Sequence, residues 1–104
     1  MPRRKQPVLS DVERKKYLAP SPAERVFWCH DGRVFRDMAE LARGLDSMSD
    51  DVFAYHANDE KNDFANWVRD VIGDQQLAGE LLRASVRAAA AEAVKRWVAV
   101  LSQP

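Results

Sequence analysis

Cysteine is nearly absent from this chain, and its scarcity limits the chemistry available. Cys29 is the single cysteine among 104 residues, so no disulfide can form within the chain and no thiolate cluster can bind a metal. No stretch approaches the roughly 18 apolar residues of a membrane-spanning helix, and no apolar run follows the basic start at Arg3, Arg4 and Lys5 as it would in a signal peptide. We therefore expect a cytoplasmic protein without membrane attachment.

Glycine is also scarce, and the common catalytic motifs are missing. The four glycines form no phosphate-binding loop, and the chain has neither a serine-centred elbow nor paired metal-binding histidines. Cys29, His30 and Asp31 suggest a nucleophile, a base and an orienting acid. Adjacent residues on a strand point to opposite faces, however, so Cys29 and His30 are not expected to touch. The sequence predicts no catalytic residue, no cofactor and no enzyme.

The composition is that of a folded domain, but its charges are grouped. Apolar residues make up 46% of the chain, too many for a disordered protein. The 16 cations equal the 16 anions in number, yet seven cations oppose three anions in residues 1–25, five oppose twelve in residues 26–82, and four oppose one thereafter. Such alternating blocks can neutralise one another within one copy or between copies.

The first 24 residues are predicted to form a basic arm. Pro2, Pro7, Pro20 and Pro22 interrupt it, which favours an extended arm with one helical turn around residues 11–17. The arm carries too many apolar residues for a plain linker, and we expect it to dock on its own core or on a partner. These apolar residues are Val8, Leu9, Val12, Tyr17 and Leu18.

Residues 25–104 are predicted to form a single helical domain that begins with a β-hairpin. Asp31-Gly32 separates two β-prone runs within residues 25–36, which favours a two-residue type I′ turn. Two strands alone are marginal in water, so the hairpin should lay Phe27 and Phe35 on the helices. Helical spacing of apolar residues then predicts helices over 37–48, 49–58, 61–72, 74–82 and 85–101, the last two separate or continuous.

Polar caps support these helix starts. Asp37, Ser49 and Asp74 are suited to the N-cap position, and Glu40 would complete a capping box with Asp37. Gly73 is expected to end the third helix. Apolar stripes place Tyr55, Leu82 and Val86 on buried faces. The predicted fold class is mainly α: a compact bundle of four to five helices preceded by a short β-hairpin and an extended basic N-terminal arm.

One block of the chain resembles a known family. It comprises Tyr55-His56, the run EKNDFANWVRDVIGD from Glu60 to Asp74, and Leu77-Ala78. The block is similar to that of a small uncharacterised family of bacterial and archaeal proteins of unknown function, and the similarity covers roughly residues 27–82. The resemblance implies a prokaryotic protein and implies no activity, cofactor or catalytic residue. The basic arm and the alanine-rich last helix lie outside it.

Polar residues in the middle of the chain are candidates for binding. His56, Asp59 and Asp63 are a candidate nitrogen and oxygen ligand set for a divalent metal, although Asp59 and Asn62 also stand where a helix needs a cap. Capping is the favoured interpretation, and no metal is expected. Asn62 and Asn66 lie four residues apart with Arg69 one turn further, a face suited to a partner's backbone or to bases. A solvated helix face explains them equally well.

Two functions follow from these features. We expect a non-enzymatic protein-interaction or assembly module that binds a protein partner or a second copy through the arm or the alanine-rich helix. The alternative is an accessory nucleic-acid or ribosome-associated protein that uses the basic N-terminal arm and the C-terminal helix. Trp67 and Trp97 follow the apolar stripes, which favours a place in the core over base stacking. The candidate interaction residues are Arg3, Arg4, Lys5, Arg14, Lys15, Lys16, Asn62, Asn66 and Arg69.

Overall fold

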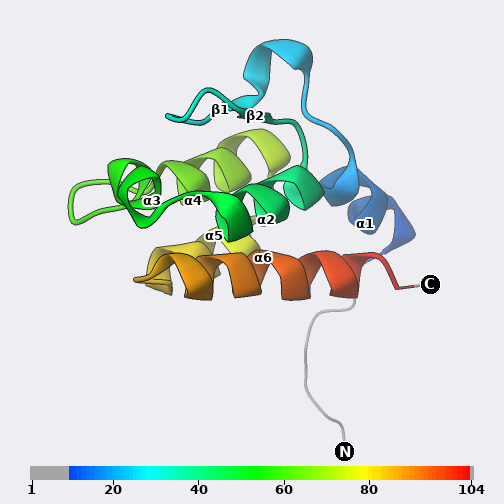
Figure 1. Cartoon of the computed structure of the whole chain (residues 1–104). Coiled ribbons are helices and arrows are strands. Elements are labelled where there is room, and N and C mark those ends of the chain that lie inside the picture. Colours follow the sequence, from blue (N-terminus) through cyan, green and yellow to red (C-terminus); the bar gives the residue numbers. More distant parts are fainter. Residues whose placement is uncertain (1–9, 104) are drawn as a thin grey trace, which may run out of the picture.

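A computed structural model describes residues 10–103 of the chain (Figure 1). The predicted mainly helical fold with a short antiparallel hairpin is confirmed there, with six α-helices instead of the predicted four to five. The elements are α1 (Asp11–Leu18), the 3₁₀ turn η1 (Ala23–Arg25), β1 (Phe27–Trp28), β2 (Val34–Phe35), α2 (Met38–Ser47), α3 (Asp50–His56), α4 (Asp63–Trp67), the π-helical turn η2 (Val68–Ile72), α5 (Gln75–Arg83) and α6 (Arg87–Leu101).

Helix α1 accounts for the additional helix. Residues 1–9 of the predicted arm lie outside the described residues, and from Ser10 onward the chain is helical for about two turns instead of one. Ser10 accepts a hydrogen bond from the Glu13 backbone N–H while the Glu13 carboxylate accepts one from Ser10 N, a complete capping box. Tyr17 and Leu18 are half-buried against the core. The second half of the arm therefore packs on the helices.

The hairpin holds the predicted aromatic face, but its turn differs from the prediction. Phe27 pairs with Phe35 across the strands, and their rings stack with centroids 5.9 Å apart. Gly32 has φ 97°, whereas no non-glycine residue between 10 and 103 has positive φ, so the type I′ turn is wrong. The loop has three residues, closed by hydrogen bonds from Gly32 N to Cys29 O and from Cys29 N to Arg33 O. Asp31 accepts a hydrogen bond from Arg33 N, which stabilises this longer loop.

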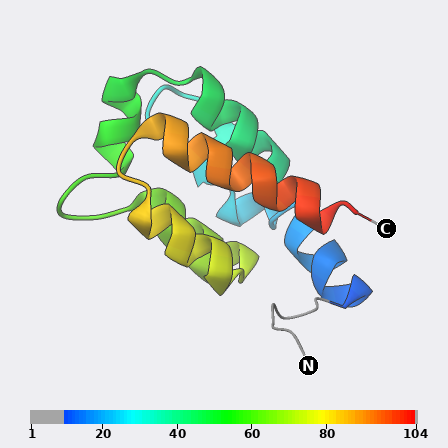
Figure 2. The same cartoon turned by 90° about the horizontal axis from the view of Figure 1, so that it is seen from below.

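The core lies between the hairpin and the helices. Helix α6 runs alongside α2 in both views, and α5 packs against α4 and α6 (Figures 1 and 2). Asp37 and Ser49 cap their helices as predicted. The Glu40 carboxylate, however, accepts from Arg36 N instead of Asp37 N, so the predicted capping box is only half formed. The described residues include no helix long and apolar enough to cross a membrane.

The helix predicted over 61–72 is α-helical in its first half and π-helical in its second. After α4 the chain widens into η2, in which the backbone N–H groups of Gly73 and Asp74 both donate to Val68 O. Gly73 then ends the helix with φ 88°, as predicted. Asp74 caps α5 by accepting from Leu77 N, and its second oxygen accepts from the indole N–H of Trp97. This buried carboxylate therefore ties the start of α5 to α6.

Three apolar side chains predicted to be buried are exposed instead. Tyr55 is 50% exposed, Leu82 62% and Val86 57%. Tyr55 and Leu82 are next to buried residues on α3 and α5. The buried face of each helix is narrower than the apolar stripe in its sequence suggests. Val86 precedes α6, which is separate from α5 and begins without a side-chain cap. These side chains are available for contacts outside the domain.

Gly44 is expected to be intolerant of even a methyl group. It lies on α2 beneath the Phe35 ring, and a Cβ built there would overlap three ring atoms. Although alanine favours a helix by up to about 1 kcal/mol over glycine, overpacking costs about 1–3 kcal/mol. We predict that Gly44→Ala lowers the free energy of unfolding, measured by urea denaturation.

Gly79 on α5 provides the matched control. Its nearest neighbour would be an Arg83 guanidinium nitrogen at 3.9 Å, an ordinary contact. Gly79→Ala should therefore raise the free energy of unfolding by roughly 0.5–1 kcal/mol. Equal effects of the two substitutions would contradict the assigned packing of Phe35 on α2.

Candidate interaction surface

The cations predicted to bind a partner through the basic arm differ in their surroundings. Arg3, Arg4 and Lys5 lie outside the described residues. Arg14 forms an ion pair with Asp11 one turn away on α1. Lys15 and Lys16 are exposed on the same helix and pair with no acid among residues 10–103. These two lysines are therefore the described part of the basic arm that can meet a partner.

Asn62, Asn66 and Arg69 differ in what their side chains contact. Asn62 is the N-cap of α4: its side-chain oxygen accepts from Ala65 N at 3.0 Å, and its amide donates to Leu81 O at 3.1 Å. Asn66 is exposed. Arg69 is also exposed and pairs with the adjacent Asp70. Asn62 thus has a structural position that links α4 to α5, and the other two remain at the surface.

The proposed ligand set of His56, Asp59 and Asp63 is not assembled. His56 Nδ1 lies 2.9 Å from Asp63 Oδ2, but Asp59 lies on the loop after α3. In the described part of the chain, no group of three or more His, Cys, Asp or Glu side chains is arranged to hold a metal ion. His56, which is buried, and Asp63, which is half-buried, instead form a pair.

Cys29 and His30 do not form a nucleophile and base. The thiol is buried, whereas His30 is exposed on the hairpin loop. Burial raises the pKa of the Cys29 thiol, so the less nucleophilic protonated form is favoured. The two residues follow β1 instead of lying within it, and the buried thiol and the exposed imidazole lie on different sides of the loop.

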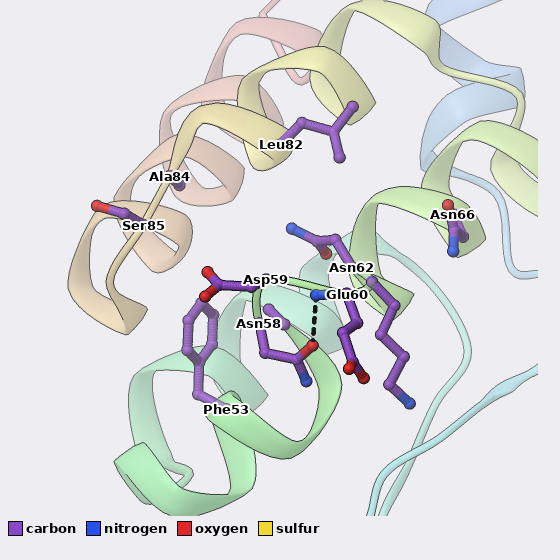
Figure 3. A pocket seen from close by; sticks show the side chains of 11 residues that line it. Phe53, Asn58, Asp59, Glu60, Asn62, Asn66, Leu82, Ala84 and Ser85 are labelled. Atoms are coloured by element: carbon purple, nitrogen blue, oxygen red, sulfur yellow. Dashed lines mark hydrogen bonds between the residues drawn. The ribbon is translucent and has the colours of Figure 1, made fainter.

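A cleft of about 550 Å³ opens between the α3–α4 loop and the link from α5 to α6 (Figure 3). Figure 3 shows the loop from Asn58 to Asn62 on one side and Leu82, Ala84 and Ser85 on the other. The volume is within the range of sites that hold several side chains or a small ligand. The lining residues are Phe53, Ala57, Asn58, Asp59, Glu60, Lys61, Asn62, Asn66, Leu82, Ala84 and Ser85.

Two asparagines fix the shape of this cleft. Asn58 donates from its amide to Ala54 O at 2.9 Å and accepts from Glu60 N at 2.9 Å, the bond dashed in Figure 3. Asn62 connects α4 to the Leu81 carbonyl at the end of α5. Because these side chains bond the backbone, they hold the loop in place and are not themselves free to bind a ligand.

The exposed groups of the cleft include two unpaired acids and an apolar side chain. Asp59 and Glu60 pair with no cation among the described residues. The Lys61 ammonium is engaged by Asp63 Oδ2 at 3.0 Å. Leu82 lies on α5, across the cleft from the loop (Figure 3). The cleft is therefore suited to a partner that brings both a cation and an apolar side chain.

An aromatic face, formed by His30 and Tyr55, adjoins the cleft. Their rings stack with centroids 3.8 Å apart and an interplanar angle of 13°. Lys61, which lines the cleft, also holds its ammonium 5.0 Å from the centre of the Tyr55 ring. Trp28, on the outward side of β1, is 72% exposed. Cleft and aromatic face are thus joined through Lys61.

The aromatic face is positioned by His56 beneath it. His56 is only 4% exposed, and its Nε2 accepts a hydrogen bond from His30 N at 2.9 Å. Nδ1 must then carry the proton and donate to Asp63 Oδ2. Burial raises the pKa of Asp63, but the hydrogen bonds from His56 and Lys61 outweigh it, so this pKa is lowered. His56 therefore connects the hairpin loop, α3 and α4.

The sequence missed both the cleft and the position of His56. The exposure of Trp28 could have been predicted from the sequence, because Phe27 faces the core and the next strand residue must face outward. The link from His56 to His30 spans 26 residues, and no local pattern indicates it.

Asp63 should make the free energy of unfolding depend on pH in the acid range. Its folded pKa is lower than the unfolded value of about 3.9. Its ionised form therefore contributes stability above that value, and the contribution is lost as pH falls through the folded pKa. We predict that Asp63→Asn lowers the free energy of unfolding at pH 7 and flattens its decline below about pH 4, measured by urea denaturation from pH 7 to 2.

Asp31 supplies the comparison for this experiment. Hydrogen bonds from the Arg33 side chain and backbone lower the pKa of Asp31 to about 2. Asp31→Asn should therefore flatten the curve down to about pH 2, and it removes no direct contact of His56. Parallel curves for Asp63→Asn and the native chain would contradict the assigned pair of His56 and Asp63.

Comparisons with other proteins return no relative for this chain. No family model, no curated protein and no solved structure matches it. The resemblance of residues 55–78 to a prokaryotic family of unknown function therefore stays a prediction.

Proposed function

We propose that the protein is a non-enzymatic protein-interaction or assembly module of the cytoplasm, and that it binds through the aromatic face and the adjoining cleft. The observation that carries this proposal is the exposure of two large aromatic side chains: Tyr55 of the aromatic face at 50%, and Trp28 on β1 of the hairpin that carries His30 at 72%. Tryptophan and tyrosine are the side chains that most often dominate the energy of protein interfaces. A single buried cysteine suits a reducing compartment.

Rigidity supports a binding role for this surface. Two hydrogen bonds to His56 hold the hairpin loop against α3 and α4, and Asn58 holds the loop after α3. A partner that binds here orders few further groups, so little conformational entropy opposes association. The aromatic face therefore behaves as a preformed contact surface.

The surroundings of the aromatic face favour a protein partner over nucleic acid. Its nearest cations are already paired, Arg33 with Asp31 and Lys61 with Asp63. Phosphate binding needs cations that neutralise the backbone. A protein surface with apolar side chains and matching polar groups suits it better.

Nucleic acid remains the second candidate function because of α1. Lys15 and Lys16 project from it with no acid partner among residues 10–103. The last helix supports this alternative less, since Arg87 pairs with Asp50 and Lys95 with Asp46. Half of the basic C-terminal charge is therefore neutralised within the domain.

Removing the exposed aromatics should abolish partner binding. We predict that Trp28→Ala with Tyr55→Ala, captured as a tagged protein from a lysate of the organism that makes it, loses the proteins retained by the native chain. Each hot-spot truncation costs about 2 kcal/mol or more, so the pair should lower retention by at least about tenfold. Retained proteins are quantified by mass spectrometry after nuclease treatment.

Val100→Ala is the matched control, because it truncates an exposed apolar side chain at the far end of α6. It should leave retention unchanged. Circular dichroism of both variants checks that the fold is intact. If nuclease releases everything the native chain retains, and Lys15→Asp with Lys16→Asp also abolishes retention, the nucleic-acid function replaces the one proposed.

A further inference from the structure

The cleft has exposed groups that its own domain does not satisfy. Asp59 and Glu60 present carboxylates without cation partners among the described residues. Leu82 is 62% exposed at the opposite wall. An apolar group across the cleft from two free acids is an incomplete surface, whereas Asp46 and Asp50 are paired with cations of α6.

Helix α1 presents the complementary set. Val12, Lys15 and Lys16 follow at intervals of three and four residues, so they share one face of the helix. Val12 is 76% exposed, and both lysines are exposed. The opposite side of α1 is the one that packs on the core through Tyr17 and Leu18. The outward face thus offers two cations beside an apolar side chain.

The two surfaces lie at opposite ends of the molecule. Figure 1 shows α1 next to the end of α6, whereas the loop between α3 and α4 lies at the far side. The outward face of α1 therefore cannot reach the cleft of its own copy. A second copy can bring the two together, and the pair would still have one free α1 face and one free cleft.

We propose that the outward face of α1 in one copy docks into the cleft of the next, joining copies head to tail. This inference rests on the proposed function and names its partner as a second copy of this chain. Lys15 and Lys16 meet Asp59 and Glu60, and Val12 covers Leu82. The contact is heterologous and open-ended, so copies associate into chains instead of closed dimers.

Association should be weak and sensitive to salt. The contact is small and its charges are exposed, so we expect a dissociation constant on the order of 0.1–1 mM at low salt. Sedimentation velocity of the purified full chain at up to about 1 mM should show a weight-average mass that rises with concentration above 11.8 kDa. The association constant should fall by at least about tenfold between 20 mM and 500 mM NaCl.

Reversed charges provide the specific test. Lys15→Glu with Lys16→Glu makes both ends acidic, and Asp59→Lys with Glu60→Lys makes both ends basic. Each variant alone should associate at least about tenfold more weakly than the native chain. An equimolar mixture should recover association, because each acidic α1 then meets a basic cleft and each basic α1 an acidic cleft. Circular dichroism confirms that each variant is folded.

Arg25→Glu with Arg43→Glu is the control, because it changes the net charge as the lysine variant does at two exposed sites away from both ends. It should associate like the native chain. A native chain that stays monomeric at 1 mM and low salt, or a mixture that fails to recover association, overturns the proposal. If a monomeric chain still loses its lysate partners on substitution of Trp28 and Tyr55, the proposed function stands and only self-assembly fails.

Discussion

A buried imidazole determines how the parts of this domain are positioned. His56 receives a hydrogen bond from the His30 backbone on one ring nitrogen and donates from the other to Asp63. A two-stranded hairpin is only marginally stable in water, and here it is anchored at its loop by this ring and at its strands by Phe27 on Phe64. The hairpin loop, α3 and α4 therefore all depend on the His56 side chain. Loss of one of its hydrogen bonds would leave a buried N–H without an acceptor, which costs about 1–3 kcal/mol.

The exposed rings above His56 are held in place by the hydrogen bonds of this buried side chain. Tyr55 and His56 are adjacent on α3, so one ring faces outward while the next lies in the core. The His30 backbone is fixed by His56 and its side chain is stacked on Tyr55. Polar contacts inside the domain therefore hold an exposed aromatic pair in a fixed arrangement outside it.

Most of the helical framework could be predicted from the sequence because it depends on short-range physics. Asp37, Ser49 and Asp74 cap helices through bonds to residues three positions on, and Gly73 ends one through its own backbone freedom. The candidate site could not be predicted in the same way. The exposure of Leu82 depends on where the α3–α4 loop lies, and the position of Asn62 depends on the Leu81 carbonyl 19 residues away. Such contacts arise only once the helices are packed.

The π-helical turn η2 sets the angular phase of everything that follows it. A π turn contains one residue more than an α turn over the same path, and each residue of an α-helix advances about 100° around the axis. If the same residues 68–72 were wound as a regular α-helix, Asp74 would point roughly 100° away from its present direction. It would then lose the indole of Trp97. The wide turn therefore accommodates one extra residue and keeps Asp74 directed at Trp97, so the winding of this segment is constrained by a contact that lies outside it.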